Sequence, residues 1–306
     1  MTEAAILPMV ARMIRPLLSL GLLALLTAAA PPADPPALMK WADLTNRPRP
    51  KPDATIAYGP DALQKADLWV PAGQGPHPVV VMVHGGCWQS DIADRTLMDW
   101  IAADLRASGI AVWNIDYRGV DRAGGGYPGT FMDVASAADQ LAEHAAHYRL
   151  DLRRIVAVGH SAGGHLALWL AARPKLPVTS PLRSPRPLKI DRVISLGGLP
   201  DLEATANSPD NGCGTEVVAR LIAGGGYADT SVPRLLPLGV GQDLIDGRND
   251  RIIPARLATD YVAAVRKAGD SVTLQMIPQT GHVELIAPET PAWAAAKRLI
   301  VAGLRR

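Results

Sequence analysis

Short apolar runs alternate along the chain with longer segments that repeat an apolar residue every three or four positions. The run PVVVMV at 78–83 is apolar throughout, which is typical of a strand buried on both faces of a sheet. Similar runs are expected to form strands at 56–59, 66–70, 110–116, 154–159, 190–196, 240–245 and 272–277. Segments with the helical pattern occupy 94–107, 129–148, 162–172, 215–223, 254–268 and 291–304. This alternation predicts an α/β domain, with a mostly parallel sheet and helices on both of its faces.

The N-terminal part of the chain does not follow this alternation. Arg12 and Arg15 precede an uncharged run over 16–30 that ends in small residues, and prolines follow it. This is the pattern of a secretory signal peptide, and the run is short for a helix that crosses a membrane. We therefore expect 1–30 to be a signal peptide and the protein to be exported, periplasmic or secreted, with no membrane span after cleavage. The alternative is a membrane anchor formed by residues 12–30.

In the rest of the chain the amino-acid composition stays uniform and no segment is repeated. We expect a Pro-rich lead over 31–53 and a single catalytic domain over 54–306. Within it, 199–237 is irregular and is a possible covering segment.

The charge balance and the cysteine count exclude several classes of function. The 306 residues include 31 Lys and Arg against 29 Asp and Glu, a net charge of +2. Nucleic acid is therefore not the expected partner, because phosphate binding needs a basic surface. Two cysteines cannot form a four-cysteine zinc site or a disulfide-dense scaffold.

The segment around Ser161 carries the most informative motif. Gly159-His160-Ser161-Ala162-Gly163 matches G-x-S-x-G and lies between a predicted strand and a predicted helix. In that context the motif is a sharp turn that presents a serine hydroxyl at the end of the sheet. Ser161 is therefore the candidate nucleophile, and the backbone N–H of Ala162 is a candidate donor to a developing oxyanion.

A second glycine-containing loop directly follows the strand at 78–83. Its sequence is His84-Gly85-Gly86-Cys87-Trp88. Glycine allows the backbone to approach a substrate carbonyl with no Cβ in between. The amides of Gly85 and Gly86 are therefore candidates for the other oxyanion donors.

The order serine, acid, histidine along the chain identifies the partners of Ser161. His282 is the only histidine that lies C-terminal to Ser161 and its adjoining helix, so it is the candidate general base. Asp250 lies in a loop before a helix and can turn toward His282. Asp243 and Asp246 remain alternatives, although their position in or at the end of a strand leaves them less freedom to reach.

These motifs resemble those of the α/β-hydrolase family over about residues 50–304. HGGCW, DYRG at 116–119, GHSAGGHLAL and the acid loop look like the branch of hormone-sensitive lipase, acetyl-esterase and BD-FAE-like serine esterases, which also holds kynurenine formamidases. The resemblance implies an α/β-hydrolase fold with an eight-stranded sheet and hydrolysis through an acyl-enzyme. It also implies that no metal or organic cofactor is needed.

Several residues near the expected pocket mouth are candidates for substrate contact. The aromatic ones are Trp88, Tyr117, Tyr127 and Phe131. If the protein is exported, an oxidising compartment makes a disulfide between Cys87 and Cys213 plausible; two reduced thiols are the alternative.

The leading functional hypothesis is a serine hydrolase that cleaves a small-molecule carboxylic ester. An arylformamidase is the alternative, since the HGG-x-W loop is compatible with it. A peptidase would use the same triad, but it is less favoured because the sequence shows no added substrate-gating domain. A non-catalytic binding protein with this fold is less favoured because all three catalytic positions are filled. The sequence leaves the oligomeric state open.

Overall fold

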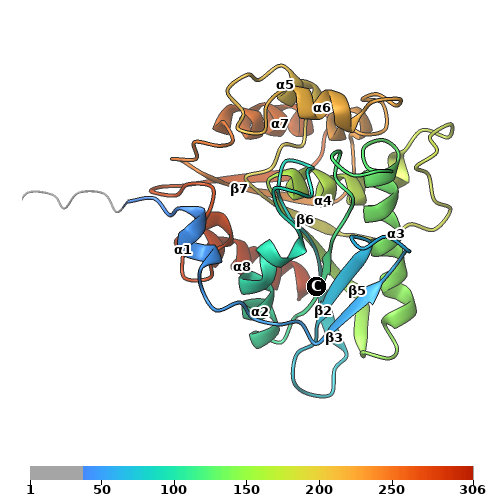
Figure 1. The fold of residues 1–306 in the computed structure, drawn as a ribbon, viewed down its shortest axis with the longest axis vertical. Helices are drawn as coiled ribbons and strands as arrows, with labels where there is room; N and C mark the ends of the chain where they lie inside the picture. The colour runs from blue at the N-terminus through green and yellow to red at the C-terminus, as the bar shows by residue number, and fades with distance from the viewer. Residues whose placement is uncertain (1–36, 306) are drawn as a thin grey trace, which may run out of the picture. The chain divides into compact units, whose positions relative to one another are not determined.

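The strongly apolar runs form the centre of an eight-stranded sheet in the computed structural model, which describes residues 37–305 (Figure 1). The order of the strands across the sheet is β1-β2-β4-β3-β5-β6-β7-β8. Strand β2 pairs antiparallel with both β1 and β4, and every other pairing is parallel. The strands are β1 (Ala54–Ala57), β2 (Lys65–Trp69), β3 (His77–Val83), β4 (Ala111–Ile115), β5 (Leu150–His160), β6 (Arg192–Leu196), β7 (Gly241–Gly247) and β8 (Val272–Ile277). The expected α/β-hydrolase arrangement is therefore confirmed.

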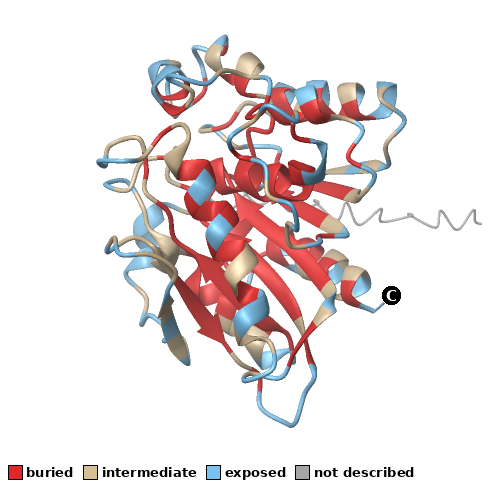
Figure 2. Cartoon of the chain, turned by 90° about the vertical axis from the view of Figure 1, so that its right-hand side faces the viewer, coloured by how far each residue is buried: buried red, intermediate tan, exposed pale blue. Residues whose placement is uncertain are grey.

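Helices cover both faces of this sheet, and each face has its own apolar core. The alternation along β3 shows the division, since Val79, Val81 and Val83 belong to one buried cluster and Val80 and Met82 to the other. The first cluster includes residues of α3 (Gly129–His144), α4 (Ala162–Ala172) and α7 (Ala255–Lys267). The second includes residues of α2 (Asp99–Ala107) and α8 (Pro291–Leu304). Figure 2 shows the buried strands between the half-exposed helices.

The compact unit of the chain begins earlier than the predicted domain. The predicted Pro-rich lead ran to residue 53, whereas the compact unit begins at Pro36. A short helix, α1 (Trp41–Thr45), lies in this segment, and its Leu44 is fully buried in the second core cluster. The boundary was missed because prolines interrupt the local pattern and the contacts are made with residues far along the chain. The predicted signal peptide and the alternative anchor lie outside the described residues.

Other element boundaries shift by a few residues. The predicted helix at 94–107 divides into a 3-10 turn, η1 (Arg95–Met98), and α2. Strand β5 begins at Leu150, four residues earlier than predicted. The segment 199–237 contains α5 (Leu202–Ala206), α6 (Glu216–Leu221) and the 3-10 turn η3 (Val232–Leu235). The remaining 3-10 turns are η2 (Arg173–Lys175) and η4 (Glu284–Ile286). Between residues 37 and 305, no helix combines the length and apolar character needed to cross a membrane.

Candidate active site

Ser161 occupies a strained turn between β5 and α4. Its backbone has φ 54° and ψ −124°, a conformation that residues with a side chain adopt only when the surroundings impose it. A Cβ on Gly159 would lie 2.0 Å from the carbonyl oxygen of Gly163, and a Cβ on Gly163 would lie 2.2 Å from that of Val83. The motif therefore needs glycine at both positions, at Gly159 so that β5 can approach α4 and at Gly163 so that α4 can approach the end of β3.

His282 and Asp250 come together from the loops after β8 and β7. The distance from His282 Nδ1 to Asp250 Oδ2 is 2.6 Å, and each side chain is 3% exposed. The other carboxylate oxygen of Asp250 accepts the backbone N–H groups of Ile252 and Ile253, at 2.8 and 3.0 Å. With Nδ1–H held by the carboxylate, His282 keeps Nε2 free to accept a proton.

Neither of the two alternative acids pairs with His282. Asp243 pairs with Arg192, at 2.5 Å from Nε, and accepts the hydroxyl of Thr273 at 2.6 Å. Asp246 is fully buried, and one of its oxygens has no partner among the described residues. Burial, together with the nearby charge of Asp250, raises the pKa of Asp246 to about 8. Of the three candidate acids, Asp250 is the one in contact with His282.

The glycines of the HGGCW loop lie beside the serine turn. A Cβ on Gly85 would be 3.0 Å from Ser161 Cβ, and Gly86 has φ +107°. Within the described part of the chain, the backbone N–H groups of Gly85, Gly86 and Ala162 donate no hydrogen bond. Three unengaged donors therefore gather around Ser161, which is what the stabilisation of an oxyanion requires.

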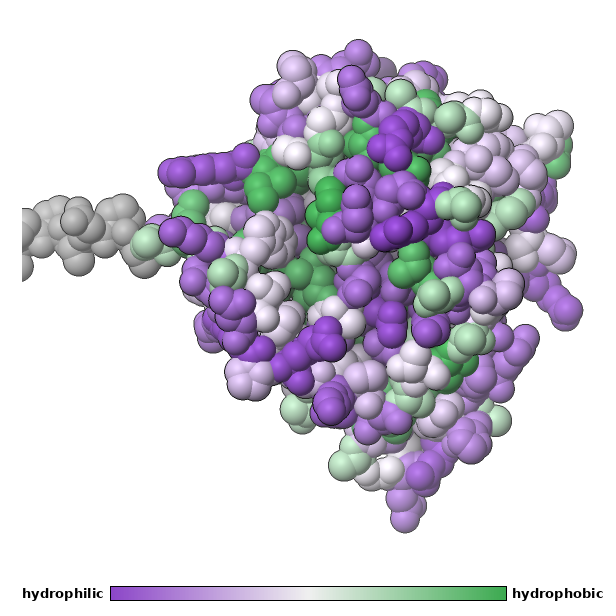
Figure 3. All heavy atoms as spheres, viewed as in Figure 1, coloured by the Kyte–Doolittle hydropathy of each residue, from purple (hydrophilic) through white to green (hydrophobic). Residues whose placement is uncertain are grey.

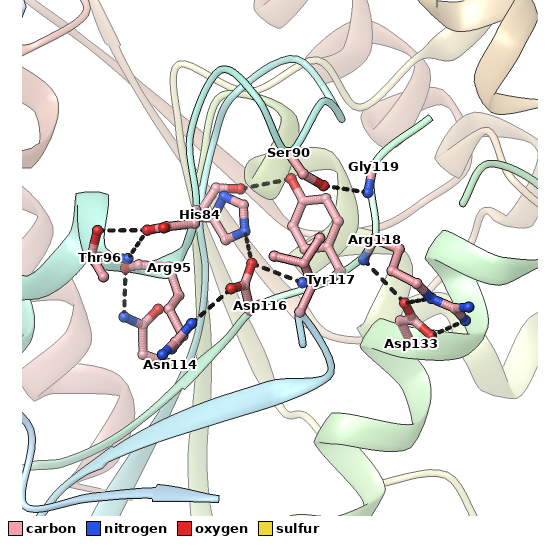
Figure 4. A network of polar contacts seen from close by, with 12 residues as sticks. His84, Ser90, Arg95, Thr96, Asn114, Asp116, Tyr117, Arg118, Gly119 and Asp133 are labelled. Carbon is pink, nitrogen blue, oxygen red and sulfur yellow. Dashed lines mark hydrogen bonds and ion pairs between the residues drawn. The ribbon is translucent and has the colours of Figure 1, made fainter. Parts of the chain in front are cut away.

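A buried polar network holds this loop in place (Figure 4). His84 Nδ1 lies 2.6 Å from the carbonyl oxygen of Gly85, and His84 Nε2 lies 3.0 Å from Asp116 Oδ1. Arg95 donates to Asp116 at 2.8 Å and to Asp67 at 2.7 Å. The ring of His84 thus connects the Gly85 carbonyl to the carboxylate of Asp116. Fixing the Gly85 carbonyl also fixes the N–H of Gly86, because the two belong to one peptide plane.

Asp133 belongs to a neighbouring ion pair in the same view. Its carboxylate binds the guanidinium of Arg118 at 2.7 and 2.8 Å (Figure 4). It also accepts the side-chain amide of Gln64 at 2.7 Å. Asp133 thus anchors the segment that follows Asp116 and makes no contact with the residues around Ser161.

A cavity of about 330 Å³ opens at Ser161, and its lining is mainly apolar. Ser161, His282, Gly86 and His160 are among its lining residues, and the other members include Trp41, Ile92, Ala93, Leu97 and Ile252. Burial, with the nearby His282, lowers the pKa of His160 well below 6.5, so His160 carries no charge at neutral pH. In Figure 3, hydrophobic residues are visible between α1 and the segment that carries α5 and α6.

The sequence analysis missed most of this apolar lining. Ile92 and Leu97 follow the HGGCW loop within ten residues, and Ile252 follows Asp250, so proximity to motif residues was an available signal. Trp41 had no such signal, because it lies in the segment that was assigned to the lead.

The predicted pocket aromatics do not line this cavity. Trp88 and Phe131 are fully buried, and Tyr117 is 1% exposed. Trp88 donates its indole N–H to His165 at 3.2 Å, and Tyr117 donates its hydroxyl to the carbonyl of His84 at 3.1 Å. The remaining candidate, the half-buried Tyr127, donates to Asp229 at 3.0 Å. The prediction was wrong because large aromatic side chains gain more from burial beneath the loops than from exposure at the mouth.

A disulfide connects the HGGCW loop to the covering segment. Cys87 and Cys213 are bonded, with their Cα atoms 5.3 Å apart. Cys87 and Gly212 both line the cavity, and Gly212 N–H donates to the carbonyl of Ile252 at 2.6 Å. The covering segment thus reaches the site through this one corner. Over residues 37–305, no three His, Cys, Asp or Glu side chains are grouped as a metal ion would need.

Comparison with known proteins gives a family match over more than half of the chain. The model of the family described as BD-FAE matches residues 66–232. A protein of Arabidopsis thaliana described as "probable isoprenylcysteine alpha-carbonyl methylesterase" is 33% identical over 114 residues. A rice protein (Oryza sativa subsp. japonica) with the same description is 33% identical over 118 residues. Each match covers 37% of this chain, and 23% and 26% of the plant proteins, so the aligned part spans about a quarter of their length.

Solved esterase structures share the fold. A truncated carbohydrate esterase from gut microbiota has a TM-score of 0.68 at 20% identity, covering 82% of this chain and 95% of its own. Esterase B from Lactobacillus rhamnosis has a TM-score of 0.69 at 18% identity, covering 84% and 87%. An esterase from Thermogutta terrifontis has a TM-score of 0.65 at 22% identity, covering 81% and 89%. At these identities the likeness concerns the fold alone.

Proposed function

Since the chain belongs to the BD-FAE family, we propose that it is a carboxylic ester hydrolase in which Ser161 is the nucleophile, His282 the general base and Asp250 the orienting acid. The contact that carries this proposal is the one of 2.6 Å between His282 Nδ1 and Asp250 Oδ2, made beside a cavity that Ser161 and His282 both line.

The first half of the reaction transfers the acyl group to the protein. Ser161 Oγ attacks the ester carbonyl carbon while His282 Nε2 takes the hydroxyl proton, and the carbonyl oxygen becomes an oxyanion. The amides of Gly85, Gly86 and Ala162 donate to that oxygen. The bond from carbon to the alcohol oxygen then breaks, His282 returns the proton to that oxygen, and the alcohol leaves an acyl-Ser161.

Water completes the cycle by the same route. It gives a proton to His282 Nε2 and adds to the acyl carbon, and the bond between that carbon and Ser161 Oγ breaks as Oγ regains the proton. Asp250 holds the ring of His282 and favours the charged imidazolium of each half-reaction. Because the lining next to Ser161 is apolar and His160 is uncharged, we propose a small apolar acyl group.

A Ser161→Ala variant tests the nucleophile. Wild-type protein should react with a fluorophosphonate probe and hydrolyse p-nitrophenyl esters, with the rate depending on acyl length. The variant should do neither, because the probe forms its bond with the activated serine oxygen. Labelling is measured on gels and by intact mass, and hydrolysis by absorbance.

Ser90→Ala is the matched control, since this serine caps the turn at Gly119 through a hydrogen bond of 2.7 Å and does not line the cavity. It should label as wild type does. Equal labelling of the Ser161→Ala variant would refute the mechanism. Turnover of N-formylkynurenine in preference to every ester would favour the formamidase alternative; the relatives and structural neighbours described above are named as esterases.

We also propose that the protein is exported after removal of residues 1–30. A disulfide between Cys87 and Cys213 is compatible with an oxidising compartment. Fractionation of the cells that produce the protein, with N-terminal sequencing, tests this. A cytoplasmic protein that retains residue 1 would contradict it.

A further inference from the structure

A second cavity, of about 550 Å³, lies next to the one that contains Ser161. Its walls come from residues 37–41, the loop after β7 and residues 281–283. The two cavities share Trp41, Ile252 and His282, whereas Ser161 and Gly86 line only the first. The catalytic histidine therefore lies at the boundary between the two spaces.

The chemistry of proton transfer indicates which cavity holds the acyl part of the ester and which holds the alcohol part. In ester cleavage the general acid must reach the oxygen of the departing alcohol, so the alcohol lies against the histidine. The acyl carbon lies against the serine and the oxyanion donors. A cavity that touches His282 but neither Ser161 nor Gly86 is therefore positioned for the alcohol.

The charges of the two linings differ. The second cavity is lined by two exposed cations, Lys40 and Arg251, and by the amide of Asn249, and no carboxylate is among its lining residues. Neither cation forms an ion pair with another described residue. Around Ser161, in contrast, the lining contains no lysine, arginine or carboxylate.

The carboxylates nearest in the chain, Asp43, Asp250 and Glu284, are already engaged by backbone N–H groups. Asp43 accepts from the N–H of Lys40 at 2.7 Å, and Asp250 accepts from Ile252 and Ile253 as described above. The buried Glu284 accepts from Met39 at 2.6 Å and from Gly281 at 3.1 Å. The bond between Met39 and Glu284 joins the N-terminal wall of the cavity to the segment that follows His282. In Figure 1, α1 correspondingly lies beside the segment that follows β8.

We propose that this second cavity binds the alcohol portion of the ester and selects alcohols that carry an anionic group, which Lys40 and Arg251 attract and Asn249 can hydrogen-bond. The assignment of the alcohol to this side rests on the proposed ester hydrolysis. The preference for an anion rests on the charges of the lining.

Two acetate esters of equal size test the preference, 4-acetoxybenzoate and its neutral counterpart 4-acetoxybenzamide. In a Lys40→Gln/Arg251→Gln double variant, we expect kcat/KM for the anionic ester to fall about three- to tenfold, because two exposed charges contribute modestly in water. The value for the neutral ester should stay within experimental error. Added NaCl at about 0.5 M should remove most of the difference in the wild type.

A Lys175→Gln/Arg183→Gln double variant is the matched control. It removes one exposed lysine and one exposed arginine that line neither cavity, so it should leave both esters unchanged. An equal fall for the two esters in the Lys40→Gln/Arg251→Gln variant, or no fall for either, would overturn the proposal.

Binding to the Ser161→Ala protein separates this proposal from the proposed function. The affinity of each phenol is measured by titration, followed by NMR at the indole N–H of Trp41. We expect 4-hydroxybenzoate to bind and 4-hydroxybenzamide to bind more weakly. This expectation holds whether or not the wild type hydrolyses esters. Wild-type protein that hydrolyses neither ester would count against the proposed function. Equal or absent binding of the two phenols would overturn the anionic subsite.

Discussion

Two aspartates, four positions apart in the chain, differ sharply in their surroundings at the end of β7. Asp250 accepts two backbone N–H groups and contacts the ring of His282. Asp246 is fully buried, and burial raises its pKa to about 8. Asp250 is therefore held against the histidine, whereas Asp246 is suited to remain protonated at neutral pH.

Asparagine substitution at each position tests this difference. Asp250→Asn should lower kcat about 10³- to 10⁴-fold, because the amide no longer stabilises the imidazolium or fixes its tautomer. Asp246→Asn replaces a protonated carboxyl with a group of the same shape and should keep most of the activity. Steady-state kinetics at pH 7 measure both. Equal losses in the two variants would contradict the assignment of Asp250.

Stability provides a further readout for the Asp246→Asn control. A carboxyl whose pKa is raised in the folded protein binds its proton more tightly there than in the unfolded chain. Wild-type unfolding free energy therefore falls as pH rises from about 4 to about 8 through this group. Asparagine does not titrate, so the stability of the variant relative to wild type should increase across the same interval in urea titrations.

Some of the elements that hold the site were predicted from the sequence and others were not. The β5 turn, the HGGCW loop and the loops after β7 and β8 were predicted because their residues carry local motifs next to recognisable strands. The apolar lining of the cavity was not predicted. Its residue Trp41 lies next to Met39, which is held by a hydrogen bond to Glu284, 245 residues away. The aromatics were misplaced because sequence pattern does not tell a buried ring beneath a loop from an exposed ring at its surface.

The disulfide between the HGGCW loop and the covering segment is expected to contribute to the free energy of unfolding. The disulfide joins residues 126 positions apart, and closing so long a loop restricts the unfolded chain. A Cys87→Ala/Cys213→Ala variant should lose about 2–4 kcal/mol of unfolding free energy in guanidinium titrations. Adding reductant should destabilise the wild type and leave the variant unchanged. Wild-type stability in the variant would contradict a structural bond between the two elements.

At the scale of the whole molecule, a single sheet brings the proposed catalytic groups together from distant parts of the chain. Ser161, Asp250 and His282 follow β5, β7 and β8, whose carboxyl ends meet at one edge. The two cores on opposite faces of the sheet support this edge, and the second core includes Leu44 from α1. The compact unit therefore begins at Pro36, further toward the N-terminus than the pattern of strands and helices suggested.

Two truncated chains test this boundary. A protein of residues 36–306 should keep the stability and activity of the longer chain. A protein of residues 54–306 should lose at least about 1.5–3 kcal/mol of unfolding free energy, which is the contribution of burying one leucine. It should also have a lower kcat/KM, because it lacks Trp41 from the cavity lining. Denaturant titration and ester hydrolysis measure the two effects. A Leu44→Ala point variant should reproduce part of the stability loss, and indistinguishable truncations would refute the boundary.

The contact between Met39 and Glu284 also bears on the order in which the protein is made. A ribosome produces the N-terminal wall of the site among the first residues of the folded unit and the loop that carries His282 among the last. The wall therefore has no partner until the 245 residues that follow Met39, up to Glu284, have been made. No nascent chain that ends before Glu284 can assemble this site, so the proposed hydrolysis cannot begin before that residue is added.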